Sequence, residues 1–231
     1  MKCYRCGAWP CVCHDGITII HGDCREVLPL LEQPSVCITD PVWPNSIFIE
    51  VSDPYSLFAE AMNLITCSRL VVHLGCASDP RFLAGVPTRL PFLRVCWLRY
   101  ARPSYRGRLL IGSDVAYAFG VAPPSLPGRR VLSGEFVARN NSTKLQHTHR
   151  GRGQSSSALY KAIDHPAPRR IEHVKWLVAL FGDGGGIIDP FMGTGTTIAA
   201  AKECKERAIG IETEERYCEI AAKRLAQEVL L

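Results

Sequence analysis

The apolar positions fall into short continuous runs, separated by longer stretches in which they recur every three to four residues. The runs predict β-strands, because strands buried on both faces carry apolar side chains at successive positions. They cover residues 17–21, 36–39, 70–74, 91–100, 115–119, 187–189 and 207–211. The longer stretches predict helices over residues 25–31, 54–66, 171–181, 196–204 and 215–227. This alternation predicts an open, mostly parallel, seven-stranded sheet with helices on both faces.

The length and composition of the chain limit the number of domains that it can form. The 231 residues, 47% of them apolar, suit one α/β domain at residues 17–231, preceded by a cysteine-rich segment at residues 1–16. No apolar run reaches the 18 residues that a membrane span needs, and residues 1–16 do not look like a secretion signal. We therefore expect a cytoplasmic protein with no membrane partner.

One predicted strand, Ile187 to Asp189, runs into a glycine turn and then a helix. The turn contains Gly193 and Gly195, which allow close approach of backbone to a ligand, and the helix start offers unpaired N–H groups. Asp189 can accept hydrogen bonds from a ligand ammonium, and the next predicted strand ends in Glu212, at the position where a ribose diol is bound in related folds. The pattern indicates a nucleoside cofactor with a positively charged part.

Four further residues follow two other predicted strands. Asp40, Pro41 and Trp43 bring a carboxylate, a stiff turn and an indole to one strand end, although an ordinary loop with a packed tryptophan has the same sequence features. Asp23 follows the strand at 17–21 and is either a ligand-binding carboxylate or the N-cap of the next helix.

Charge is distributed unevenly along the chain. The net charge is +5, yet the segment from Arg81 to Lys161 holds 14 Lys and Arg against only Asp114 and Glu135. A block of this kind predicts a partner with a phosphate backbone. Residues 123–157 show no regular pattern, and the stretch at 139–157 also fits a disordered connector.

The cysteine-rich segment holds four thiols, Cys3, Cys6, Cys11 and Cys13, within 11 residues. Four thiolates suffice for a tetrahedral structural zinc, whereas free or buried cysteines are the alternative. The other seven cysteines lie among apolar residues, which favours core packing.

Taken together, Asp189-Pro-Phe191-x-Gly193-Thr194-Gly195-Thr196, Glu212 and Asp40-Pro41-Val-Trp43 resemble the S-adenosylmethionine-dependent DNA amino-methyltransferases. The tetrapeptide precedes the cofactor motif, as in the circularly permuted β class of that family. The resemblance implies a Rossmann-like methyltransferase fold with a target-recognition insertion at about residues 81–163.

The resemblance also implies roles for individual residues. Asp189, Phe191, Gly193, Thr194, Gly195 and Thr196 would surround the methionine part of the cofactor, with His165 in the element before them. Glu212 would bind the ribose hydroxyls and Asp23 the adenine amino group. Asp40 and the Pro41 carbonyl would accept both hydrogens of a target amine, while Trp43 would stack on the flipped-out base. Val42 departs from the family's second proline, and Arg169 and Arg170 replace other residues in the element that begins with His165.

These implications predict a DNA methyltransferase of bacterial or phage origin that acts on adenine N6. The alternatives are cytosine N4, methylation of RNA or of a protein amide, and a non-catalytic nucleic-acid-binding protein with a degenerate core. The resemblance also allows a homodimer. No endonuclease motif is present, so a restriction endonuclease partner would be a separate chain.

Overall fold

A computed structural model describes residues 1–43, 51–76, 78–125, 133–138 and 169–226. The described strands form one sheet in the order β1-β8-β7-β2-β3-β5-β4-β6. The strands are β1 (Ile17–His21), β2 (Val36–Thr39), β3 (Arg69–Gly75), β4 (Phe92–Arg106), β5 (Leu109–Gly120), β6 (Glu135–Ala138), β7 (Ile187–Asp189) and β8 (Ala208–Glu212). Only β5 pairs antiparallel with its neighbours, so the predicted mostly parallel sheet is confirmed.

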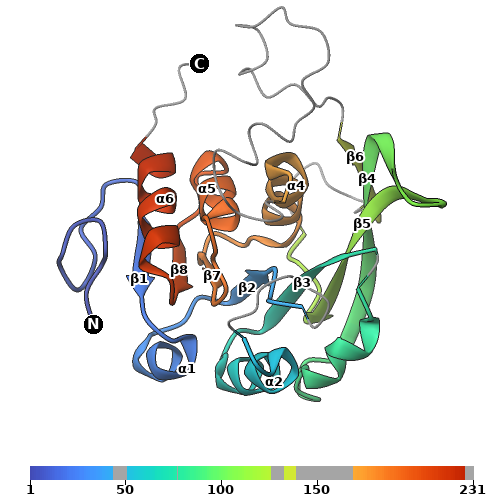
Figure 1. Ribbon diagram of the computed structural model, residues 1–231. Helices are drawn as coiled ribbons and strands as arrows, with labels where there is room; N and C mark the ends of the chain where they lie inside the picture. Colours follow the sequence, from blue (N-terminus) through green and yellow to red (C-terminus); the bar gives the residue numbers. More distant parts are fainter. Residues whose placement is uncertain (44–50, 77, 126–132, 139–168, 227–231) are drawn as a thin grey trace, which may run out of the picture.

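Helices cover both faces of the sheet (Figure 1). The helices are α1 (Cys24–Val27), α2 (Pro54–Leu64), α4 (Ile171–Phe181), α5 (Thr196–Glu203) and α6 (Glu215–Ala226), with short 3-10 turns at η1 (Leu28–Leu30) and η2 (Pro80–Gly85). One apolar core lies between the sheet and α4, α5 and α6, and the other lies between the sheet and α1 and α2. Among the described residues, no helix has the length and apolar character needed to cross a bilayer.

Successive side chains of the central strands enter opposite cores. In β2, Val36 and Ile38 pack in the core of α4 to α6, whereas Cys37 packs in the core of α1 and α2. In β3, Val71 packs in the core of α4 to α6, and Leu70 packs in the core of α1 and α2. Because both faces are covered, these strands are apolar at successive positions, which is why their sequence pattern located them.

The sheet has eight strands where the sequence predicted seven. The additional strand, β6, pairs parallel with β4 and lies in the stretch where no regular pattern was recognised. Its four residues alternate between more and less exposed positions, so they provide no apolar run.

The hairpin of β4 and β5 is also longer than predicted. Its strands continue through residues 101–111, a stretch that contains three arginines, with a turn at Gly107. The end of the hairpin projects beyond the sheet (Figure 1). Tyr105, Leu109 and Leu110 are exposed there. Strand pairing without burial leaves no apolar run in the sequence, which explains the shorter prediction.

Candidate functional site

Two strand ends define the centre of the site. β2 and β7 are parallel neighbours, with Val36 opposite Ile187 and Cys37 opposite Ile188. This register brings their carboxyl ends to the same edge, although the two strands are about 150 residues apart in the chain. Helices leave these strands on opposite faces of the sheet, and the crevice at such a point is where open α/β sheets bind ligands.

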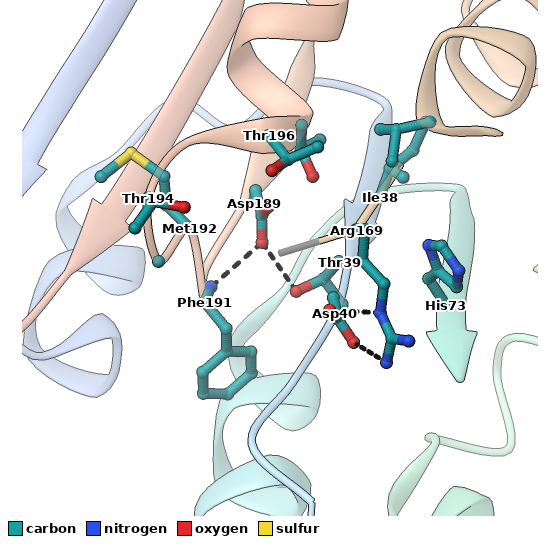
Figure 2. A pocket seen from close by; sticks show the side chains of 13 residues that line it. Ile38, Thr39, Asp40, His73, Arg169, Asp189, Phe191, Met192, Thr194 and Thr196 are labelled. Atoms are coloured by element: carbon teal, nitrogen blue, oxygen red, sulfur yellow. Dashed lines mark hydrogen bonds and ion pairs between the residues drawn. The ribbon is translucent and has the colours of Figure 1, made fainter. Parts of the chain in front are cut away.

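Asp189 ends β7 and is only 2% exposed. Its Oδ1 accepts hydrogen bonds from the Thr39 hydroxyl at 2.7 Å and from the Phe191 N–H at 3.1 Å (Figure 2). Burial raises the pKa of Asp189 to about 6, opposed by hydrogen bonds from Thr197 and Thr39. The carboxylate is therefore costly to charge in the absence of a cationic ligand.

The glycine turn after β7 is held by Glu212 at the end of β8. The Gly193 N–H donates to Glu212 Oε2 at 2.8 Å, and the Glu214 N–H donates to Oε1 at 2.9 Å. Gly193 and Gly195 have φ values of 54° and 80°, which favour glycine. A Cβ added to Gly195 would come within 2.8 Å of Ala221, so close packing also requires glycine there. Burial raises the pKa of Glu212, opposed by its backbone donors.

The Asp40 carboxylate, directly after β2, lies against Arg169. Arg169 Nε donates to Asp40 Oδ2 at 2.7 Å and Nη2 donates to Oδ1 at 3.0 Å, a two-point ion pair drawn in Figure 2. The guanidinium carbon also lies 4.5 Å from the centre of the Trp43 ring, and Nη1 donates to Asp114 Oδ2 at 3.2 Å. One arginine therefore contacts two of the predicted catalytic residues.

Burial alone would lower the pKa of Arg169, but the carboxylates of Asp40 and Asp114 raise it above its usual value. The pKa of Asp114 lies below its usual range because His73 and Arg169 outweigh the effect of its burial. These directions agree with a charged, buried cluster at the edge of the sheet.

Two cavities open beside these groups. The larger one, of about 640 Å³, is lined by all three predicted catalytic residues and by four predicted cofactor residues. They are Asp40, Pro41, Trp43, Asp23, Phe191, Gly193 and Glu212. The smaller one, of about 50 Å³, is shown in Figure 2 and is lined by Asp189, Thr194 and Thr196 together with Asp40 and Arg169. The volume of the larger cavity suits a nucleoside ligand.

Of the two roles that the sequence allows for Asp23, the structure shows the N-cap, whereas ligand binding stays a prediction. Asp23 is the N-cap of α1, where it accepts a hydrogen bond from the Arg25 N–H at 2.8 Å, and it also lines the larger cavity. Gly195 precedes the first turn of α5. His165 lies outside the described residues.

Three polar residues of the site could not be linked to Asp40 from the sequence. Arg169, Asp114 and His73 come from the chain before α4, from β5 and from β3, and they meet Asp40 only in the folded protein. One signal was available. Asp114 is one of two acidic residues in the basic block, and an isolated carboxylate inside an apolar strand requires a buried partner.

The described part of the basic block adds β4, β5 and β6 to the sheet. Arg102 and Arg108 are exposed near the end of the β4–β5 hairpin, and Arg99 is exposed along β4. Residues 126–132 and 139–161 of the block lie outside the described residues.

The four cysteines of residues 1–16 converge, and the N-terminal segment that holds them lies beside β1 at the edge of the sheet (Figure 1). Their sulfur atoms all lie within 4.8 Å of one another, with 3.3 Å between Cys3 and Cys11 and 3.8 Å between Cys6 and Cys11. Tetrahedral zinc with bonds of about 2.3 Å places its sulfur ligands about 3.8 Å apart. The spacing is therefore compatible with a four-thiolate metal site.

Comparison with known proteins gives a family match and several relatives. The N6/N4 methyltransferase family model, described as DNA methylase, matches residues 91–223, which is more than half of the chain. The orphan methyltransferase M.BamHII of Bacillus amyloliquefaciens is 33% identical over 104 residues, or 43% of this chain. That alignment spans 37% of the length of M.BamHII.

Two solved structures share the fold. The M1.HpyAVI–SAM complex has a TM-score of 0.64 at 20% identity, covering 91% of this chain and 100% of that one. The cytosine-N4-specific PvuII DNA methyltransferase has a TM-score of 0.61 at 11% identity, covering 93% of this chain and 88% of that one. Likeness at this level of identity supports the Rossmann-like methyltransferase architecture.

Proposed function

This chain belongs to the DNA methylase family, and from that premise we propose that it methylates DNA. The methyl group comes from S-adenosylmethionine, and the acceptor is the exocyclic amino group of a flipped-out base, with adenine N6 as the target. The observation that carries the proposal is the shared cavity, in which Asp40, Pro41 and Trp43 face the same space as Glu212 and the glycine turn.

The cavity residues fit such a cofactor. Glu212 Oε2 accepts the Gly193 N–H and retains a lone pair for a ribose hydroxyl, whereas Oε1 accepts both the Glu214 N–H and the Thr213 hydroxyl. Asp23 lines the same cavity at the end of β1 and can accept from the adenine amino group. Asp189 lines the smaller cavity, which shares Phe191 and Gly193 with the larger one, and it can accept from the ammonium of the methionine part. When bound, the cofactor supplies an electrophilic sulfonium methyl.

The tetrapeptide can prepare the target amine. An exocyclic amine is a poor nucleophile because its lone pair is conjugated with the ring. Asp40 and the Pro41 carbonyl can accept its two hydrogens, and Trp43 can stack on the base. The amine nitrogen would then bond to the methyl carbon that the cofactor supplies, the cofactor would leave as a thioether, and the proton lost by the nitrogen would pass through Asp40 to water. Rate enhancement comes from orientation and electrostatics, with no covalent enzyme intermediate.

Exposed arginines on the β4–β5 hairpin support DNA as the partner, because phosphates bind such side chains without sequence preference. Adenine N6 is the proposed target because the tetrapeptide begins with Asp, whereas cytosine-N4 members of the family more often begin with Ser. Cytosine N4 is the second candidate, supported by the shared fold with a cytosine-N4-specific enzyme. A homodimer, a separate restriction endonuclease and a cytoplasmic location remain predictions.

The test is methyl transfer from labelled cofactor to unmethylated duplex DNA, followed by digestion and identification of the modified nucleoside. Asp40→Ala is expected to reduce transfer by at least about 1,000-fold while cofactor binding is retained. Transfer to RNA or protein alone, or no transfer by the wild type despite cofactor binding, would contradict the proposal.

We also propose that Cys3, Cys6, Cys11 and Cys13 hold one structural zinc ion. Four thiolates complete a tetrahedral shell, so the ion has no open position for chemistry. The purified chain is expected to contain about one zinc, which Cys6→Ser reduces together with the melting temperature. Cys76→Ser is the matched control, because Cys76 is an exposed cysteine outside the cluster. Absence of zinc in the wild type refutes the site.

A further inference from the structure

The guanidinium of Arg169 connects the catalytic tetrapeptide to the central sheet. It engages both oxygens of Asp40 with Nε and Nη2, and it uses Nη1 for Asp114 on β5. Its flat face covers the Trp43 ring. The Arg169 and Asp114 side chains are only 15% and 8% exposed, so solvent screens these contacts little. The side chain therefore bridges two parts of the fold.

The bridge is anchored on three neighbouring strands. Asp114 of β5 lies 3.5 Å from Nε2 of His73 on β3. Tyr100 of β4 lies beside the same carboxylate: burial and the nearby Asp114 together raise the pKa of its hydroxyl. The guanidinium of Arg170 stacks on the Tyr100 ring at 4.4 Å. Asp114 thus belongs to paired strands, whereas Asp40 lies in the loop that follows β2.

We propose that Arg169 is a positioning residue for methyl transfer: anchored by Asp114, it holds the Asp40 carboxylate and the Trp43 ring in the geometry that receives the target amine. This inference rests on the proposed function. Each Asp40 oxygen gives one lone pair to Arg169 and retains another for an amine hydrogen. A loop carboxylate without such a tether would sample several rotamers, and small displacements of a reacting group cost up to about 100-fold in rate.

A positioning role predicts a specific kinetic pattern. Arg169→Gln is expected to lower kcat by about 10- to 100-fold, with the Kd for S-adenosylmethionine within about threefold of wild type. Arg169→Lys is expected to recover only part of the rate, since an ammonium cannot make a two-point contact. Asp114→Asn leaves Arg169 in place but weakens its anchor, so its kcat is expected to fall less than that of Arg169→Gln.

Arg5→Gln is the matched control. Arg5 makes a comparable two-point ion pair with Asp15, at 2.8 Å and 3.0 Å, and its side chain is 19% exposed, but it lies beside β1, outside both cavities. Its kcat is expected to match wild type. Thermal unfolding of every variant distinguishes a loss of the fold from a displacement of Asp40 and Trp43 within an intact fold. If Arg169→Gln does not fold, Asp114→Asn and Arg169→Lys still test the inference.

Three outcomes would overturn the inference. Unchanged kcat in a folded Arg169→Gln would make the bridge purely structural. A loss of cofactor affinity in proportion to kcat would make Arg169 a cofactor ligand. A rise in kcat would mean that Arg169 occupies the place of the target base. All three require an active wild type; an inactive wild type would refute the proposed function and the inference with it.

Discussion

Asp40 and Asp189 stand at the ends of adjacent strands, yet the fold treats the two carboxylates differently. Asp189 is 2% exposed, and its hydrogen bonds come from neutral donors, the Thr39 and Thr197 hydroxyls and the Phe191 N–H. Asp40 has a side chain that is 26% exposed and faces a guanidinium on both oxygens. A buried carboxylate with neutral donors favours a cationic ligand, whereas a tethered one with free lone pairs can receive N–H groups. One residue type can therefore suit two proposed roles, with Asp189 binding the cofactor ammonium and Asp40 binding the target amine.

Removing the charge of Asp189 tests this contrast most strongly. Its folded pKa of about 6 lies above the usual 3.8, so the folded state binds the proton more tightly than the unfolded state. Protonated Asp189 therefore contributes to the free energy of unfolding below pH 4, and this contribution is lost as pH rises through 6. In the free protein, Asp189→Asn is expected to remove a decline of about 3 kcal/mol in unfolding free energy between pH 4 and pH 7.

Denaturant unfolding at several pH values, compared between wild type and Asp189→Asn, measures that decline. Parallel stability curves for the two proteins would show that Asp189 titrates normally and that burial does not distinguish the carboxylates. Cofactor affinity of the wild type is also expected to weaken as pH falls below 6, because the ammonium would select the charged form.

Glu212→Gln sharpens the comparison on the cofactor side. The amide keeps an acceptor for the Gly193 N–H but loses the charge that strengthens hydrogen bonds to a ribose diol. Cofactor affinity is expected to fall about 30-fold, which corresponds to about 2 kcal/mol. Calorimetry gives the measurement, with Glu219→Gln on the exposed face of α6 as the chemically identical control. Equal affinity in both variants would exclude Glu212 from the binding site.

Thr39→Val makes the smallest expected change. It removes the hydroxyl that donates to Asp189 Oδ1 at 2.7 Å and leaves the side-chain shape unchanged. Loss of this hydrogen bond is expected to cost about 1 kcal/mol and to raise the pKa of Asp189 further. The buried Thr18→Val on β1 is the control. If both variants lose the same stability and share one pH dependence, Thr39 does not tune the carboxylate.

The sequence was informative where a strand and its functional residue are neighbours. Asp189, Gly193 and Glu212 lie at or just after the ends of apolar runs, so the pattern that located the strands also pointed to these cavity-lining residues. Asp40 was located in the same way. Its partner Arg169 lies 129 residues away and follows a stretch without regular pattern, so only the folded sheet brings the two together.

The extent of the β4–β5 hairpin escaped prediction for a related reason. Its outer half pairs through backbone hydrogen bonds, while side chains such as Tyr105 remain in solvent. Apolar periodicity records burial, and a segment that pairs without burial leaves little trace in it. β6 was missed because its four residues alternate between more and less exposed positions and so form no apolar run.

The cysteine segment has a consequence for the solution behaviour of the whole molecule. β1 ends the sheet, and its outward carbonyls would be open to strand addition by another chain. The Tyr4 N–H binds the Ile19 carbonyl at 2.7 Å, and the Arg5 guanidinium binds the Ile17 carbonyl at 3.0 Å. Unprotected sheet edges template intermolecular β-pairing. The cysteine segment therefore covers the β1 edge. Oxidation of its four thiols is expected to disturb this cover and to appear first as aggregation through the β1 edge.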